Sequence, residues 1–254
     1  MRSALRKAFI VIVLLGLWEV AARVASTPLL FPTFWEVGKS FWSLTVGSGA
    51  LPGFVKETCK SLFAGFGIGA ALATVLTALA INTKLGEEFL ATITGSLAPL
   101  PAVAVFPISL MIFGISLGSV VFISAFATVF PVAVAMTQGF RAVSQTLRGV
   151  GRNLGMSKLG LTCRVLMPAA LPSILTGLRS GFSNAFRALV AVEMVIGAAT
   201  GSGGLGWFVM SSKQNLDIPE VYAGILAIML VGLAFEGLFR LIEAQTVRKW
   251  GMLE

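Results

Sequence analysis

The sequence lacks histidine altogether and has two cysteines, with 19 lysines and arginines and 11 aspartates and glutamates in 254 residues. Without histidine, imidazole metal sites, histidine-based catalytic triads and histidine proton relays are excluded. Cys59 and Cys163 lie far apart in the chain and indicate no disulfide or metal framework. Charged residues make up 12% of the chain, about half the share of an ordinary soluble domain.

Apolar residues are abundant where charged residues are few. They make up 56% of the chain, and the mean hydropathy is +0.91. This composition predicts an integral membrane protein without room for a separate soluble catalytic domain. No G-x-x-x-x-G-K-[ST] motif occurs, so the chain is not expected to hydrolyse ATP alone. The G-x-G-x-x-G match at 201–206 follows a membrane helix rather than a strand, and we interpret it as an outer turn.

A helix needs roughly 20 apolar residues to cross a bilayer. Six segments meet this length and predict an all-α polytopic protein: Ala8 to Val24, Ser61 to Ile81, Glu88 to Ile115, Gly118 to Gly139, Ala170 to Gly197 and Val221 to Ala244. The third contains Pro99, Pro101 and Pro107, so we expect it to be kinked or discontinuous. A broken membrane helix survives only where protein or a water-filled cavity meets its backbone, which indicates a pathway there.

Two further segments lie near the N-terminus. The first apolar run follows Arg2, Arg6 and Lys7 and is too long for a signal peptide, so we interpret it as a retained helix. The segment from Phe31 to Leu44 mixes tryptophans with charged residues, which is typical both of an amphipathic interfacial helix and of an ordinary aromatic belt.

Lysine and arginine are distributed unevenly between the predicted loops. The positive-inside rule favours both termini in the cytoplasm, which also places 140–168 there. No aspartate or glutamate occurs from Phe89 through Val192, so this loop is basic without compensation. We ascribe the net charge of +8 to membrane orientation and expect no nucleic-acid partner.

The cytoplasmic segment has no long apolar run. We expect short helices separated at Gly149, Gly151 and Gly155, with a partly apolar face after the last of them. Helices this short need a docking surface, which could be lipid headgroups, another loop or a partner protein.

The spacing of this segment resembles the signature of importer permeases of the ATP-binding-cassette (ABC) superfamily. That signature reads Glu-Ala-Ala, three residues, Gly, nine residues, Ile-x-Leu-Pro, and here Gly155 is followed after nine residues by Val165-Leu166-Met167-Pro168. The run PAALPSILTGLRSGFSNAFRALVAVEMV and the run LAPLPAVAVFPISLMIFGI resemble the permeases for taurine, aliphatic sulfonates and nitrate. The resemblance extends from Thr58 to Ala244.

The resemblance implies a function for the loop. In these permeases it forms a coupling helix in a groove of a separate ATPase subunit. The residues that match this role here are Gly155, Met156, Ser157, Lys158, Leu159, Gly160, Leu161, Arg164 and Pro168, and Pro168 is expected to restart the chain into the next membrane helix. Gly149-Val150-Gly151 replaces Glu-Ala-Ala, so weaker helicity is expected before Gly155.

The resemblance also implies the rest of the machine. The chain would be a single transmembrane permease domain, 1–254, in the bacterial inner membrane and not itself an enzyme. Its partners would be two ABC ATPase subunits, a second copy of the permease, and a periplasmic or lipoprotein solute-binding protein. No cofactor is expected on this chain, because ATP and magnesium would be used by the ATPases. Transport would proceed by alternating access.

Ionisable residues inside a span indicate function unless they are paired. Arg187 lies in the middle of the fifth span, where the resembling permeases have small, hydroxyl or apolar residues. It either pairs with Glu193 or another acid, or lines the pathway of an anionic substrate. We assign the pathway to Ser183, Asn184, Arg187, Pro99 and Pro101. Arg179 is expected to snorkel or bind a carbonyl, Glu193 to be interfacial, and Glu19 and Glu236 to be structural or interfacial.

Glycines recur at short spacing in the second and fifth predicted spans. Gly65, Gly67 and Gly69, with Gly177 and Gly181, favour close helix packing inside the protein over a dimer seam.

A secondary transporter is the alternative function, although it would ordinarily carry acids in its central spans. An intramembrane enzyme would need a nucleophile and base, which the sequence does not offer. Sulfonates, nitrate, bicarbonate-like anions, aromatic carboxylates and neutral heterocycles remain open as substrates.

Overall fold

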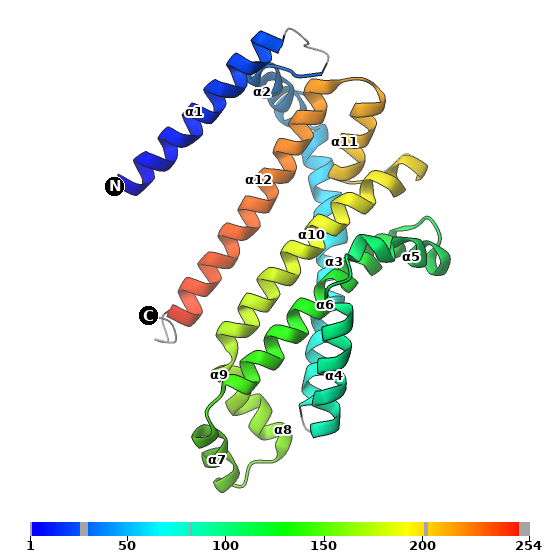
Figure 1. Ribbon diagram of the computed structural model, residues 1–254. Coiled ribbons are helices and arrows are strands. Elements are labelled where there is room, and N and C mark those ends of the chain that lie inside the picture. The colour runs from blue at the N-terminus through cyan, green and yellow to red at the C-terminus, as the bar shows by residue number, and fades with distance from the viewer. Residues whose placement is uncertain (1, 26–29, 82, 201–202, 249–254) are drawn as a thin grey trace. The chain divides into compact units, whose positions relative to one another are not determined.

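The computed structural model describes residues 2–25, 30–81, 83–200 and 203–248. All regular structure in these ranges is helical, which confirms the all-α prediction. Each predicted span coincides with a helix (Figure 1), in the order α1 Arg2–Ala25, α3 Ala50–Ala80, α4 Lys84–Leu97 with α5 Phe106–Phe113, α6 Leu117–Ala142, α10 Leu171–Thr200 and α12 Ile218–Glu243.

Three of the described helices are long and apolar enough to cross a membrane by themselves. They are Ala50–Ala80, Leu117–Ala142 and Ile218–Thr246. The helices Lys84–Leu97 and Ala102–Phe113 pass the same test together but are bent by 92°. Pro99 and Pro101 lie at this bend, and Pro101 caps the short 3-10 helix η2, Ala102–Val105. The predicted discontinuity of the third span is therefore confirmed.

The chain divides into two compact units. One contains residues 1–58 and 193–230, and the other contains 59–192 and 231–254, so that α3, α10 and α12 each contain a boundary. The prediction of one transmembrane domain concerns function and is not decided by this division.

In the first unit, aromatic side chains join α1 to the segment that follows it. The ring of Trp18 contacts Phe31, Phe34 and Tyr222, and its indole N–H donates to the Pro32 carbonyl at 3.1 Å. The helix α2, Phe34–Trp42, continues into a π-helix, η1, Ser43–Gly47, so the helical part of the prediction for Phe31 to Leu44 is confirmed.

The helix α11, Leu205–Gln214, also belongs to the first unit. This helix was not predicted from the sequence, because the glycines before it indicate a turn and its ten residues are too few for a membrane span. The first two residues after Gly204, Leu205 and Gly206, are buried. The rest of the interpreted turn at 201–202 lies outside the described residues.

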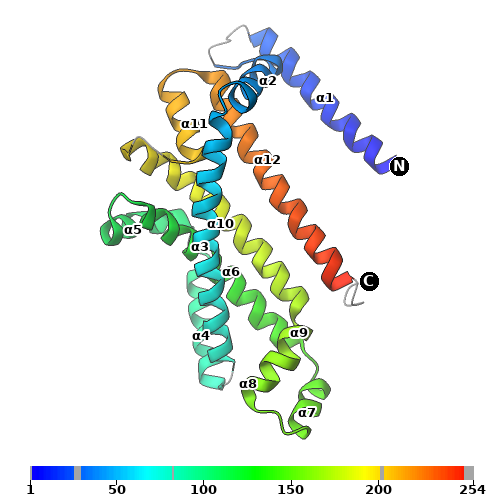
Figure 2. The same ribbon diagram turned by 180° about the vertical axis from the view of Figure 1, so that it is seen from behind.

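In the second unit, α6 packs closely against two other helices. An ideal Cβ on Gly65 or Gly69 of α3 would lie 2.4 or 2.5 Å from atoms of α6, and one on Gly177 of α10 would lie 2.5 Å from the Ala135 Cβ. Glycine is therefore required for the helix spacing at these positions. The prediction of internal packing is confirmed, and Figures 1 and 2 both show α10 alongside α6. Gly67 differs, because an ideal Cβ there would meet nothing within 4 Å.

The core of the second unit lies where α6 and α10 approach the segment that joins them. Its buried members come from α3, α6 and the chain leading into α10: Ala73, Val132, Ala133, Met136, Phe140, Val143, Leu166 and Ala170. Burial of this many apolar side chains fixes the segment before α10 to the body of α6.

Candidate functional site

The segment after α6 forms helices of its own. The helix α7, Gln145–Asn153, includes Gly149 and Gly151, so the prediction of breaks at these two glycines is wrong. Figures 1 and 2 show α7 and α8 beyond the C-terminal end of α6. Arg148 stabilises the start of this segment by donating to the carbonyl oxygens of Phe140 and Val143, a contact that was not predicted from the sequence.

Gly151 explains how α7 packs. An ideal Cβ at Gly151 would lie 2.4 Å from the Leu161 Cδ1, and the Met156 Sδ and Val165 Cγ2 would lie 3.5 and 3.6 Å away. A residue without a side chain lets Leu161 approach the α7 backbone. Gly151, the last residue of the Gly-Val-Gly departure from the signature, therefore lies where the segment folds back on itself.

Gly155 makes the turn between α7 and α8. Its φ of +70° is in the left-handed region, which glycine adopts without steric cost. The Met156 N–H donates to the Gly151 carbonyl at 3.2 Å, as in a helix C-terminal cap. Ser157 then begins α8, Lys158–Leu161, by accepting the Gly160 N–H on its hydroxyl at 3.1 Å. The predicted break at Gly155 is confirmed.

The predicted coupling residues differ in exposure. Ser157, Lys158, Arg164 and Pro168 are exposed, together with Cys163, while Met156 and Gly160 are partly buried. Leu161 is buried against Gly151 and supports the segment from within instead of facing a partner. The side chain of Leu159 lies outside the described residues.

The return to the membrane is more complex than predicted. A π-helix, η3, Thr162–Leu166, leads into α9, Met167–Ala169, which contains Pro168. Ala170 interrupts the helix with φ −90° and ψ 1°, and α10 begins at Leu171. The expectation that Pro168 starts the membrane helix is therefore wrong, because this proline belongs to a separate helical turn.

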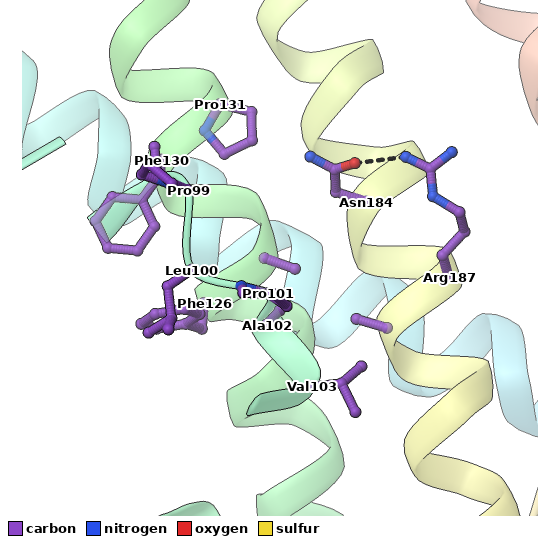
Figure 3. Close-up of a pocket in the computed structure, with 13 residues that line it drawn as sticks. Pro99, Leu100, Pro101, Ala102, Val103, Phe126, Phe130, Pro131, Asn184 and Arg187 are labelled. Carbon is purple, nitrogen blue, oxygen red and sulfur yellow. Dashed lines mark hydrogen bonds between the residues drawn. The ribbon is translucent and has the colours of Figure 1, made fainter. Parts of the chain in front are cut away.

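A cavity of about 320 Å³ lies beside the bend of the third span. Figure 3 shows its wall from three segments: the loop Pro99–Val103, α6 with Phe126, Phe130 and Pro131, and α10 with Asn184 and Arg187. Four of the five predicted pathway residues line it, namely Pro99, Pro101, Asn184 and Arg187. Ser183 is half-buried and is not part of the wall.

Arg187 is held by its neighbour one helical turn away. Its Nη2 donates to the Asn184 Oδ1 at 2.5 Å, as the dashed line in Figure 3 marks. Among the residues that the structure describes, no carboxylate pairs with Arg187. The interpretation in which Arg187 pairs with an acid therefore has no pair to support it among these residues, and Glu193 has other partners.

Glu193 is a buried carboxylate in the first unit, with 4% of its surface exposed. It accepts the Thr58 hydroxyl at 2.9 and 3.1 Å and the Gly206 N–H at 3.0 Å. Thr58 in turn accepts the Leu205 N–H at 2.7 Å. The expectation of an interfacial role for Glu193 is corrected, because its carboxylate holds the N-terminus of α11.

Arg179 forms ion pairs instead of the expected snorkelling or carbonyl contact. Its guanidinium binds both carboxylate oxygens of Glu236 on α12, with the Nε to Oε2 distance at 3.0 Å, and its Nη1 lies 3.4 Å from Glu243. The pair with Arg179 agrees with the structural role expected of Glu236. Glu19, near the end of α1, accepts the Phe34 N–H and pairs with Arg23.

The sequence is similar to a known protein family and to permeases of several organisms. The family described as binding-protein-dependent transport system inner membrane component matches residues 65–248. The putative aliphatic sulfonates transport permease of Bacillus subtilis (strain 168) is 31% identical over 92% of this chain and 81% of its own length. Its namesake in Escherichia coli (strain K12) is 27% identical over 94% and 90%. The nitrate import permease of Leptolyngbya laminosa is 28% identical over 97% and 88%.

Proposed function

The chain belongs to the inner membrane components of binding-protein-dependent transport systems, and we propose that it is the membrane subunit of an ATP-driven importer for a small anionic solute. The chain is thus an ABC transporter permease of the sulfonate and nitrate type and an integral inner membrane protein. The names of its relatives refer to sulfonates and nitrate, which are both oxyanions. This common chemistry supports an anionic solute.

One observation carries the coupling part of the proposal. Ser157, Lys158 and Arg164 are exposed on a segment whose Leu166 is buried in the core with residues of α6. A partner that moved this exposed surface would move the adjoining ends of α6 and α10 with it, because a packed core transmits displacement. The exposed residues are basic and polar, which suits an acidic groove on the partner.

The complete transporter in this proposal contains two copies of the chain, two ABC ATPase subunits and a solute-binding protein. ATP and magnesium are bound by the ATPases. Closure of the ATPase pair moves the segment 156–164 of each copy, and the pathway opens to alternate sides of the membrane. Both termini and the loop 140–168 face the cytoplasm.

Co-purification tests the proposal. The chain is co-expressed with the ATPase subunit encoded nearest to it, and the complex is reconstituted with the binding protein in liposomes. We expect the ATPase to co-purify and uptake of a sulfonate or nitrate to require ATP. Lys158→Glu with Arg164→Glu should release the ATPase, because two exposed charges are reversed on the segment.

Lys84→Glu is a control for reversing an exposed charge, since Lys84 is also exposed, begins α4, and lies between the second and third predicted spans, in a loop that the same topology places in the cytoplasm. It should leave the complex intact. Uptake that needs an ion gradient and no ATP would contradict the proposal and would favour a secondary transporter. Equal ATPase retention by wild type and the Lys158 and Arg164 double variant would contradict the assignment of this segment.

A further inference from the structure

The cavity beside the bend has one charged residue and a mostly apolar wall. We propose that it is a binding site within the permease for a small organic anion, with the oxyanion head on Arg187 and an apolar body against Phe126, Phe130 and Pro131. This inference rests on the proposed transport function and narrows its substrate class. It favours organic sulfonates and carboxylates over a bare inorganic anion such as nitrate.

The head of the ligand is assigned from the guanidinium of Arg187. Arginine offers five donors in a planar fork that matches carboxylate and sulfonate oxygens. Asn184 takes a bond from Nη2 alone, and Figure 3 shows the two side chains side by side on α10. The remaining donors have no carboxylate partner among the described residues, and an unpaired cation in the middle of a predicted span is expensive to keep. An anionic ligand supplies the missing charge.

The body of the ligand is assigned from the rest of the wall. Phe126 and Phe130 form an edge-to-face pair with centroids 5.0 Å apart, and Pro99, Pro101 and Pro131 add further apolar surface. Sites for small molecules are typically concave, mostly apolar, and oriented by a few polar groups. A volume of about 320 Å³ is at the lower end of the range for such sites, which suits a small organic molecule.

Nitrate would use the guanidinium and leave the aromatic wall without contacts. An aromatic or short aliphatic group attached to the same kind of head would cover that wall and gain free energy in proportion to the apolar area buried. The two ends of the site therefore make separate, measurable contributions.

The test uses the purified full-length chain in nanodiscs, without ATPase or binding protein. Binding of benzenesulfonate, methanesulfonate and nitrate is measured by calorimetry at one ionic strength set with chloride. We expect benzenesulfonate to bind roughly tenfold or more tightly than methanesulfonate, because the two share a head and differ in apolar area. Nitrate should bind no more tightly than methanesulfonate.

Two variants separate head from body. Arg187→Gln should weaken both sulfonates by a similar factor, roughly tenfold or more, because both lose a charge-assisted bond. Phe130→Ala should weaken benzenesulfonate and leave methanesulfonate unchanged. Arg187→Lys keeps the charge without the fork and should bind with intermediate affinity. Arg23→Gln, an exposed arginine paired with Glu19 on α1, is the control for net charge and should bind like wild type.

Several outcomes would overturn the inference. Equal sulfonate affinities of wild type and Arg187→Gln would contradict the assignment of Arg187 as the site for the oxyanion head. Equal affinities of the wild type for nitrate and benzenesulfonate would contradict the assignment of the aromatic wall as the site for the apolar body. Aggregation of Arg187→Gln together with wild-type affinity in Arg187→Lys and Phe130→Ala would make Arg187 a structural residue only. Because the assay uses no ATPase, these failures differ from failure of the proposed function, which would appear as uptake independent of ATP.

Discussion

The hydroxyl of Thr58 on α3 lies between the carboxylate of Glu193 on α10 and the backbone N–H of Leu205 at the start of α11. Thr58 is separated from these two residues by 135 and 147 positions in the chain, and all three residues are buried. One hydroxyl group therefore connects the parts of α3 and α10 that belong to the first unit with α11, by donating to the acid and accepting from the amide.

Removal of this hydroxyl should destabilise the protein. Thr58→Val keeps the shape of the side chain but leaves the Leu205 N–H and part of the Glu193 carboxylate without partners. Each unsatisfied buried polar group costs about 1–3 kcal/mol. Thermal unfolding of the purified chain in detergent measures the effect. Thr137→Val is the control, because Thr137 donates only to the Ala133 carbonyl of its own helix. Equal stabilities of the two variants would contradict the role of Thr58.

Two neighbouring glycines of α3 should respond oppositely to alanine. In Gly65→Ala the new Cβ would lie 2.4 Å from the Ser124 Cβ and 2.8 Å from the Val121 carbonyl oxygen, so α3 and α6 must move apart. Gly67→Ala meets nothing within 4 Å and should gain up to about 1 kcal/mol from helix propensity. Unfolding temperatures in one detergent test this pair. A destabilising Gly67→Ala with a neutral Gly65→Ala would contradict the packing of the Gly65 face of α3 against α6.

The ion pair between Arg179 and Glu236 should stabilise the pairing of α10 with α12 in the second unit. Arg179→Gln leaves Glu243 without its cation and Glu236 with Arg240 alone, at 3.7 Å, and we expect a loss of about 1–3 kcal/mol in detergent unfolding. Exchange of the charges, Arg179→Glu with Glu236→Arg, should recover part of this loss. The recovery is incomplete because Glu243 then faces a like charge. A double variant no more stable than Arg179→Glu alone would show that the pair contributes nothing.

The start of α2 should depend on pH. Glu36 accepts the backbone N–H of Thr33 at 2.8 Å and its hydroxyl at 2.9 Å, and these bonds hold the pKa of Glu36 below its ordinary value of 4.5. A lowered folded-state pKa gives a contribution that is present above 4.5 and lost as pH falls through the lowered pKa. Amide hydrogen exchange at Glu36 and Val37, corrected for intrinsic rates, should therefore lose protection on acidification. Glu36→Gln, which keeps a capping side chain, should reduce this pH dependence.

Local sequence signals predicted the elements of the fold well. The apolar runs indicated the helices α1, α3, α6, α10 and α12 because bilayer thickness sets the length of a span. Proline chemistry predicted the bend between α4 and α5, and the glycine spacing predicted close packing of α3 and α10 inside the protein, although not that α6 is their partner. These predictions depend on residues within a few turns of one another, where sequence distance and spatial distance agree.

Partners distant in sequence were not predicted. Nothing near Arg179 indicates Glu236, and nothing near Glu193 indicates Thr58. The helix α7 was underestimated because propensity disfavours glycine, while the close approach of Leu161 to Gly151 requires it. The chemistry of Pro99, Pro101, Asn184 and Arg187 indicates a pathway, but their position around one cavity depends on how α6 and α10 pack and is evident only in the structure.

Protection of Cys163 tests the coupling role most directly. This thiol is exposed in the segment between Lys158 and Arg164, whereas Cys59 is partly buried on α3. In a Cys59→Ser chain, the rate of maleimide labelling is measured with and without the ATPase subunit. We predict that the bound ATPase slows labelling of Cys163 strongly and that addition of ATP changes the rate. An ATPase that co-purifies with the chain yet leaves the labelling rate unchanged would contradict the assignment of this segment as the coupling surface.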